Sequence, residues 1–314
     1  MSTTYSRDTK IAIGFWDHGT GIFDEHDPQE KEKKLREMRG SRSVRIKLLR
    51  PSRSRFLTSN LTDKQKAMLH DDTDNGLLTN REAGRMLASA LDRKVSMIFS
   101  DTCLNGMVEV MHEFAEHAEV IVASEDLEPG DGWDYKLWFE KMATEPAVDS
   151  ASWAKQAVTA FEETYRDKSK LHPCTLGAFS TDNRLAQAFK ELIEAVDAHG
   201  TGWYWMRDAR EITQSFSTYA TYDLFHFAEN LKKVLENKAD AEAIRGKTDA
   251  LAAALKSCRV HSVALGDKVL NSHGLAFWFP YEKALLVRDI ATYSTLSFDV
   301  HTGWTAYLKK QYNL

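Results

Sequence analysis

Four short apolar runs, each bounded by polar residues, recur along the first 182 residues of the chain. They have the length of strands and lie at 10–17, 94–101, 119–126 and 174–181. Segments with the apolar spacing of a helix stand between them, the clearest at 78–91, 106–117 and 151–166. Strands that alternate with helices predict a mostly parallel α/β sheet with crossover helices.

The pattern changes after residue 183, where helical segments dominate. The clearest are 184–199, 221–236 and 240–257, and strand-like runs return at 259–266 and 274–280. We expect two parts, an α/β core over residues 1–182 and a mostly helical C-terminal subdomain over 183–314 that returns to the sheet.

A charged segment interrupts the core. Residues 24–60 have no steady apolar period, and eleven Lys or Arg fall between Lys31 and Arg55. This composition predicts a long, exposed basic loop.

The overall composition is that of a soluble globular protein, with 43% hydrophobic and 28% charged residues. A net charge of −5 gives no global sign of nucleic-acid binding, and no apolar run has the length to cross a bilayer. The N-terminus lacks the apolar centre of a signal peptide. Three scattered cysteines are too few for a disulfide framework or a structural zinc site. We therefore expect a reduced, cytoplasmic location, no membrane and no nucleic-acid partner.

Two predicted strands end in residues that suit catalysis. His18 and Gly19 follow the first strand, and Cys103 stands two residues beyond Asp101 at the end of the second. If these strands are neighbours, imidazole and thiol face each other and support nucleophilic acyl transfer. The N–H groups of Gly19 and Cys103 could line an oxyanion hole. The alternative is a packed cysteine and a histidine in a turn.

Three motifs in the same order resemble the clostripain-like cysteine peptidases, family C11 of the caspase–gingipain–legumain clan. They are GFWDHGTG (14–21), FSDTCLNGMVEV (99–110) and VIVASEDLEPGDGWDY (120–135). The resemblance runs from about residue 10 to the C-terminus. It implies a caspase-like sandwich, with a mostly parallel central sheet flanked by helices and a mainly helical C-terminal subdomain.

The resemblance also implies roles for individual residues. His18 is the expected catalytic histidine, Cys103 the nucleophile, and Gly19 and Cys103 the oxyanion donors. Relatives cleave after Arg or Lys, and the matching pocket acids are Asp101 and Asp131, because carboxylates pair well with a guanidinium. The alternatives are that Asp101 caps the following helix and that Asp131 is a turn residue.

Relatives undergo maturation cleavage between the histidine and the cysteine, where this chain has its basic loop. Exposed segments are also where proteolytic nicking concentrates. We therefore expect a zymogen that is cut, by itself or by an upstream protease, after one of Arg36, Arg39, Arg42, Arg45, Arg50, Arg53 and Arg55.

Family members usually carry further strands before the histidine strand, which starts here by about Lys10. A reduced variant, a fragment, or a partner that completes the N-terminal side of the sheet would each account for this difference.

Residues 71–82 match most of an EF-hand calcium loop. The weak calcium candidates are Asp71, Thr73, Asn75 and Glu82. Helix capping is an alternative role for Glu82, because with Thr79 it forms the sequence of a helix capping box. Some relatives depend on calcium, but we expect that no cofactor is required.

The prediction is a cysteine endopeptidase that cleaves after Arg, tolerates Lys, and acts on proteins or peptides with exposed basic residues. Two alternatives stay open: a clan peptidase with non-basic specificity, and a catalytically silent scaffold or regulator with the same fold.

Overall fold

The computed structural model shows the core of the chain and its C-terminal half. It describes residues 9–16, 19, 21–22, 69–71, 76–146, 149–170, 172–181, 184–216 and 220–314. His18, the basic loop at 24–60 with all seven of its candidate arginines, Thr73 and Asn75 lie outside the described residues.

A five-stranded sheet forms the centre of the described structure. Its strands are β1 (Ala12–Trp16), β4 (Val95–Asp101), β5 (Ala118–Ala123), β6 (Cys174–Ser180) and β9 (Arg259–Leu265). They lie in the order β1-β4-β5-β6-β9. The first three run parallel, while β6 is antiparallel to both β5 and β9. The sheet is therefore mixed and mostly parallel.

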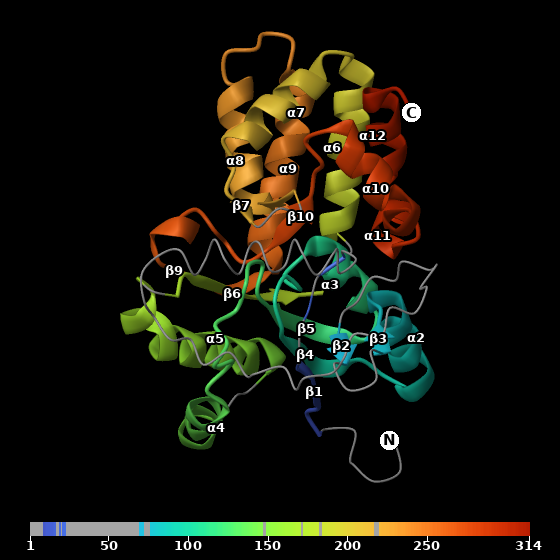
Figure 1. The fold of residues 1–314 in the computed structure, drawn as a ribbon. Helices are drawn as coiled ribbons and strands as arrows, with labels where there is room; N and C mark the ends of the chain where they lie inside the picture. Colours follow the sequence, from blue (N-terminus) through green and yellow to red (C-terminus); the bar gives the residue numbers. More distant parts are fainter. Residues whose placement is uncertain are drawn as a thin grey trace, which may run out of the picture.

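Helices cover both faces of this sheet (Figure 1). On one face α5 (Ser150–Tyr165) lies across β4, β5, β6 and β9, with α4 (Tyr135–Thr144) packed beside it. On the other face α3 (Val108–Phe114) contacts β5, and α2 (Asn80–Ala90) packs on α3. Because both faces are covered, β5 is an almost continuous apolar run rather than an alternating one.

The C-terminal half is mostly helical and gathers at one end of the molecule (Figure 1). Its helices are α6 (Arg184–His199), α7 (Gly202–Glu211), α8 (Leu224–Leu235), α9 (Glu242–Cys258), α10 (Lys283–Tyr293), α11 (Ser297–Thr302) and α12 (Trp304–Tyr312). A small antiparallel sheet accompanies them, with β7 (Ser215–Phe216), β8 (Thr221–Asp223) and β10 (Ala276–Trp278) in the order β10-β8-β7.

One apolar cluster joins the two halves. It extends from Phe15 and Phe114 in the core to Phe189 and Trp304 in the C-terminal helices. Helix α11 packs directly on α3, and β9 returns to the central sheet beside β6. The helical half therefore shares an apolar core with the sheet and also supplies its edge strand, β9.

The strands expected from the sequence are present, with one difference in direction. β6 runs antiparallel to β5, because two helices, α4 and α5, separate these strands in place of the single crossover helix of a parallel pair. Helix α4 was not predicted.

A second difference concerns Leu69 and His70, the last two residues of the segment 61–70, whose residue pattern predicts a helix. They belong to β2 (Leu69–Asp71), which pairs with β3 (Gly76–Leu78).

In the part of the chain that the structure describes, no helix has the length and apolar character needed to span a membrane.

Candidate active site

The two strands that lead to the candidate catalytic residues are neighbours. β1 and β4 pair in parallel, and Trp16 lies in register with Asp101 at their carboxyl ends. The predicted adjacency is thus confirmed. His18 follows Trp16 by two residues but lies outside the described residues, so its catalytic role stays a prediction.

A tight turn presents Cys103 between the end of β4 and the start of α3. Leu104 adopts φ 64°, a left-handed conformation that costs a non-glycine residue about 1–2 kcal/mol. The turn is anchored on the segment after β5, since the Leu104 N–H donates to the Asp126 carbonyl at 3.2 Å. The Asn105 amide donates to the hydroxyls of Ser100 and Thr102. These bonds fix the direction in which the turn holds Cys103.

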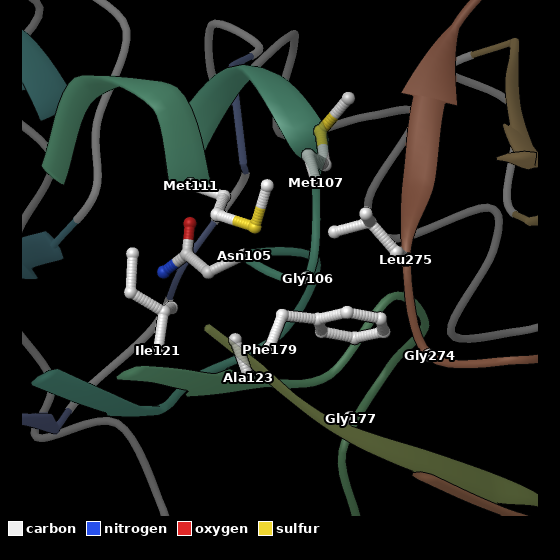
Figure 2. A pocket seen from close by; sticks show the side chains of 10 residues that line it. All are labelled: Asn105, Gly106, Met107, Met111, Ile121, Ala123, Gly177, Phe179, Gly274 and Leu275. Carbon is white, nitrogen blue, oxygen red and sulfur yellow. The ribbon is translucent and has the colours of Figure 1, made fainter. Parts of the chain in front are cut away.

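The C-terminal half supports the same turn. The Ala276 N–H donates to the Gly106 carbonyl at 2.8 Å, and the Gly274 N–H donates to the Glu125 carboxylate at 3.0 Å. Between these contacts lies an apolar cavity of about 10 Å³, lined by residues such as Met107 and Phe179 (Figure 2). It has room for about one water molecule, so it is too small for a substrate side chain.

Gly19 packs on the backbone of the nucleophile turn. A Cβ atom at this position would lie 2.7 Å from the Cys103 carbonyl oxygen and 2.7 Å from the Thr102 hydroxyl. Only glycine fits such an approach, which places the residue after His18 directly against Cys103. The oxyanion roles of the Gly19 and Cys103 N–H groups stay predictions.

The Cys103 thiol lies in an acidic surrounding. It is partly exposed, whereas Cys174 and Cys258 are buried. Burial is the largest cause that raises its pKa to about 12, and the charges of Glu128, Asp126 and Asp101 add to the rise. The Glu128 N–H donates to Sγ at 3.3 Å, and this hydrogen bond lowers the pKa of Cys103. With the described residues alone the thiol stays protonated at neutral pH, so attack requires a general base.

Asp101 lies buried at the end of β4, two residues before Cys103, with 5% of its surface exposed. Its Oδ2 accepts hydrogen bonds from the Tyr135 hydroxyl at 2.8 Å and from the Trp133 N–H at 3.3 Å. Gly132 allows this loop to come close, because a Cβ atom there would lie 3.1 Å from the same oxygen. The alternative of helix capping is not observed, since α3 starts after Met107 without a side-chain cap. The pocket role of Asp101 stays a prediction.

Glu128 was missed by the sequence analysis. The residue is half-buried, and its carboxylate accepts from the Trp133 indole N–H at 3.2 and 3.3 Å. Burial, followed by the charge and the hydrogen bond of Asp101, raises the pKa of Glu128 well above its ordinary value. The sequence feature that could have indicated Glu128 is its position directly before the Pro-Gly turn.

Asp131, the second predicted pocket acid, lies at an exposed position of the same loop. The loop turns there, with the Gly132 N–H donating to the Pro129 carbonyl at 2.9 Å. The Asp131 charge adds to the effect of burial in raising the pKa of the Tyr165 phenol. Its role in substrate binding stays a prediction.

The calcium candidates occupy a hairpin and a helix start. Asp71 ends β2 and pairs with Gly76 of β3, so a strand stands where an EF-hand has its first helix. Glu82 closes the capping box of α2 with Thr79. Among the residues that the structure describes, no cluster of three His, Cys, Asp or Glu is arranged to hold a metal ion. Calcium at this loop stays untested.

Comparison with known proteins gives a family match. The sequence model of the Clostripain family matches residues 56–250, more than half of the chain. The matched range includes Asp101, Cys103 and Glu128, while His18 precedes it. A comparison with curated proteins finds no sequence match.

Solved structures of C11 proteases share the fold at low identity. An inactive zymogen from Parabacteroides distasonis is 13% identical with a TM-score of 0.55, over 93% of this chain and 69% of its own. A secreted protease from Bacteroides thetaiotaomicron, bound to an irreversible peptide inhibitor, is 11% identical with a TM-score of 0.58, over 94% and 72%.

A third structure, a clostripain from Bacteroides thetaiotaomicron with a peptide inhibitor, is 12% identical with a TM-score of 0.52, over 73% of this chain and 96% of its own. The turn that holds Cys103 after the end of β4 lies within the matched range. The chain therefore belongs to the clostripain family, and it is a cysteine endopeptidase.

Proposed function

We propose that the chain cleaves peptide bonds after Arg, tolerates Lys at the same position, and uses Cys103 and His18 as a catalytic dyad. The observation that carries the proposal is the position of Cys103 on a fixed turn close to two acids, the buried Asp101 and the half-buried Glu128.

The dyad would work in two steps. The His18 imidazole takes the thiol proton while sulfur attacks the substrate carbonyl carbon. The tetrahedral intermediate then loses the amine, which receives that proton, and leaves a thioester. Water, deprotonated by the same imidazole, hydrolyses the thioester and restores the thiol. The raised pKa of Cys103 supports a role for His18 as the base, because a thiol that is protonated before the reaction needs a base to remove its proton.

The specificity follows from charge. Among the described residues, no lysine or arginine contributes to the raised pKa of Glu128. The carboxyl groups of the buried Asp101 and the half-buried Glu128 would favour a guanidinium or ammonium group from the substrate. The clostripain from Bacteroides thetaiotaomicron supports this idea, since its inhibitor carries the peptide VLTK, which ends in lysine.

Regulation by cleavage within residues 36–55 belongs to the same proposal. The Parabacteroides distasonis protein is described as an inactive zymogen, which supports a zymogen form here.

We also propose that the peptidase needs no cofactor and acts in the cytoplasm. The protease from Bacteroides thetaiotaomicron is secreted, so cell fractionation is required to test the location.

Fluorogenic peptides that differ only in their last residue before the bond test this function. Arg and Lys peptides should be cleaved, and Asp and neutral peptides should not, with Cys103→Ala as the control. Cleavage of neutral or acidic peptides in preference to Arg would favour a different specificity. No cleavage by a folded and processed protein would favour a silent scaffold.

A further inference from the structure

Two histidines from distant parts of the chain meet where the helical half packs on the core. His112 lies on α3 and His301 on α11, and these two helices contact each other (Figure 1). The centroids of their imidazole rings are 5.5 Å apart, and the ring planes make an angle of 78°. The proposed peptidase mechanism uses neither ring.

Each imidazole has one nitrogen in a hydrogen bond with an oxygen of a neutral side chain. His112 Nδ1 lies 2.9 Å from the Ser297 hydroxyl, and His301 Nε2 lies 3.3 Å from the Gln187 amide oxygen. An amide oxygen can only accept, so a neutral His301 carries its proton on Nε2 and has its lone pair on Nδ1. Metal-binding histidines are supported in the same way, by an oxygen acceptor for the nitrogen that does not bind the metal.

The second nitrogen of His112 lacks a partner. Its Nε2 atom is buried and makes no hydrogen bond with any residue that the structure describes. Ser297 and His301 lie about one turn apart on the same face of α11, so the imidazole that contacts Ser297 lies alongside His301. Leaving a buried polar atom without a partner is unfavourable, so this nitrogen is the strongest indication of a ligand.

The separation of the two rings suits one shared metal ion. Two imidazoles that bind a tetrahedral Zn²⁺, each with a Zn–N distance of about 2.1 Å, have ring centroids about 5 Å apart. A small movement of the side chains therefore brings the observed 5.5 Å to this value. His301 is half-buried, so solvent water can fill the remaining ligand positions.

The charges around the pair allow a cation to bind. The charge of Glu116 acts on the His112 imidazole, and the Glu113 carboxylate lies at the start of α11, where it accepts from the Ser297 N–H at 2.5 Å. Within the described structure, His301 is the only basic side chain whose charge acts on His112. Imidazole nitrogens suit Zn²⁺, Cu²⁺ and Ni²⁺, whereas Ca²⁺ and Mg²⁺ prefer oxygen ligands.

We infer that His112 and His301 form a binding site for a divalent transition-metal ion that joins α3 to α11. His112 would bind through Nε2 and His301 through Nδ1, with water completing the tetrahedron. Because α3 follows directly after the turn that holds Cys103, an ion at this site would hold the C-terminal half against that helix. The inference does not depend on the proposed function, in which no metal takes part.

Zn²⁺ binding gives the first test. Zn²⁺ is titrated by calorimetry into the whole chain of Cys103→Ala, which lacks the partly exposed thiol, and into the same protein with His301→Gln, His112→Gln or His117→Gln. His117 is the matched control, because it is a half-buried histidine just after α3.

The parent and His117→Gln should bind Zn²⁺ in the micromolar range. His301→Gln and His112→Gln should each bind at least about tenfold more weakly, since loss of even an outer-shell partner costs about 10–100-fold in metal affinity. Equal affinity in the parent and His301→Gln, or no binding to the parent at 100 times the protein concentration, overturns the proposal.

Thermal unfolding tests whether the ion joins the two helices. Saturating Zn²⁺ should raise the melting temperature of the parent by about 3–5 °C and leave that of His301→Gln unchanged. Ca²⁺ should produce no shift that His301→Gln abolishes. A Zn²⁺ shift of the same size in both proteins overturns the proposal.

A third measurement needs no variant, so it decides the question even if His112→Gln does not fold. Cu²⁺ is bound in place of Zn²⁺ at one equivalent, and pulsed electron paramagnetic resonance counts the imidazole ligands. The parent should show two imidazoles on one ion. A spectrum with a single imidazole, or with none, overturns the proposal.

Discussion

The α-carbon of Gly19 lies so close to Cys103 that a methyl group on it would come within 2.7 Å of the Cys103 carbonyl oxygen. This contact places the residue that follows His18 in the sequence against the turn that holds Cys103. The close approach of Gly19 to this turn therefore depends on the absence of a side chain at residue 19.

Gly19→Ala is expected to lower kcat about 100-fold while the protein stays folded. The added methyl group must push the two segments apart, and a displacement of about 1 Å in a catalytic site costs on the order of 100-fold in rate. The measurement is kcat together with the melting temperature. Gly246→Ala is the matched control, because a Cβ atom there meets nothing within 4 Å. Full activity in Gly19→Ala would contradict the tight packing.

Cys103→Ala is expected to abolish peptide cleavage without unfolding the protein, because it removes the nucleophile from a partly exposed turn. Cys174→Ala should show the reverse, with activity retained and stability lowered by about 1–2 kcal/mol, because its side chain is buried in the core. Peptidase assays and urea unfolding measure both effects. Substantial turnover by folded Cys103→Ala would refute the assignment.

Asp101→Asn is expected to impair cleavage after Arg much more than cleavage after neutral residues. The substitution keeps the acceptor for Tyr135 and removes the charge that would pair with a guanidinium. Loss of one partner of a buried ion pair costs about 2–5 kcal/mol. The check is kcat/KM for matched Arg and citrulline peptides. An equal loss on both peptides would show that Asp101 positions Cys103 instead.

The basic loop gives a prediction about processing. Active wild-type protein is expected to consist of two associated fragments cut within residues 36–55, and purified Cys103→Ala is expected to stay intact. Tethering keeps the segment at a high effective concentration near the site, which favours cleavage by the enzyme itself. Mass spectrometry of both proteins decides the point. Full activity from an uncut chain would rule out activation by cleavage, and nicking of Cys103→Ala in the absence of other proteases would rule out self-cleavage.

Glu109 gives a prediction about pH. It is fully buried on α3, accepts from the Trp278 N–H at 2.8 Å and the Tyr293 hydroxyl at 2.7 Å, and burial raises its pKa from 4.5 to about 7. The folded state favours the protonated acid, so this stabilisation is complete below pH 4.5 and is lost as the pH rises through about 7. The loss is at most about 3 kcal/mol.

Glu109→Gln should remove that part of the pH dependence. The free energy of unfolding of the variant, relative to wild type, should therefore increase between pH 5 and pH 8, as measured by urea unfolding. The exposed control Glu140→Gln should follow the wild-type curve. Parallel curves for Glu109→Gln and wild type would show that Glu109 does not titrate in this range.

The sequence predicts the strand ends well where local pattern determines them. Apolar runs ending in His-Gly and Asp-Thr-Cys indicate strand ends, and the pairing of Trp16 with Asp101 shows that the two ends meet. The direction of β6 could not be read in this way, because it depends on how α4 and α5 carry the chain between strands. A strand has the same residue pattern in either direction.

Glu128 shows a second limit of sequence reasoning. An acid before Pro-Gly has the composition of a solvated turn, and nothing local indicates that its side chain contacts Trp133. Its position follows from contacts with Asp101 and Trp133, which the loop reaches only because Gly132 leaves room beside the Asp101 carboxylate. The more typical turn acid, Asp131, is the exposed one.

The hydrogen bond from Ala276 to Gly106 has a consequence for biosynthesis. The turn that holds Cys103 is braced by a segment that is translated long after it. A nascent chain thus lacks part of the frame of this turn until Ala276 has been made. Chains that end before Ala276 are therefore expected to be inactive.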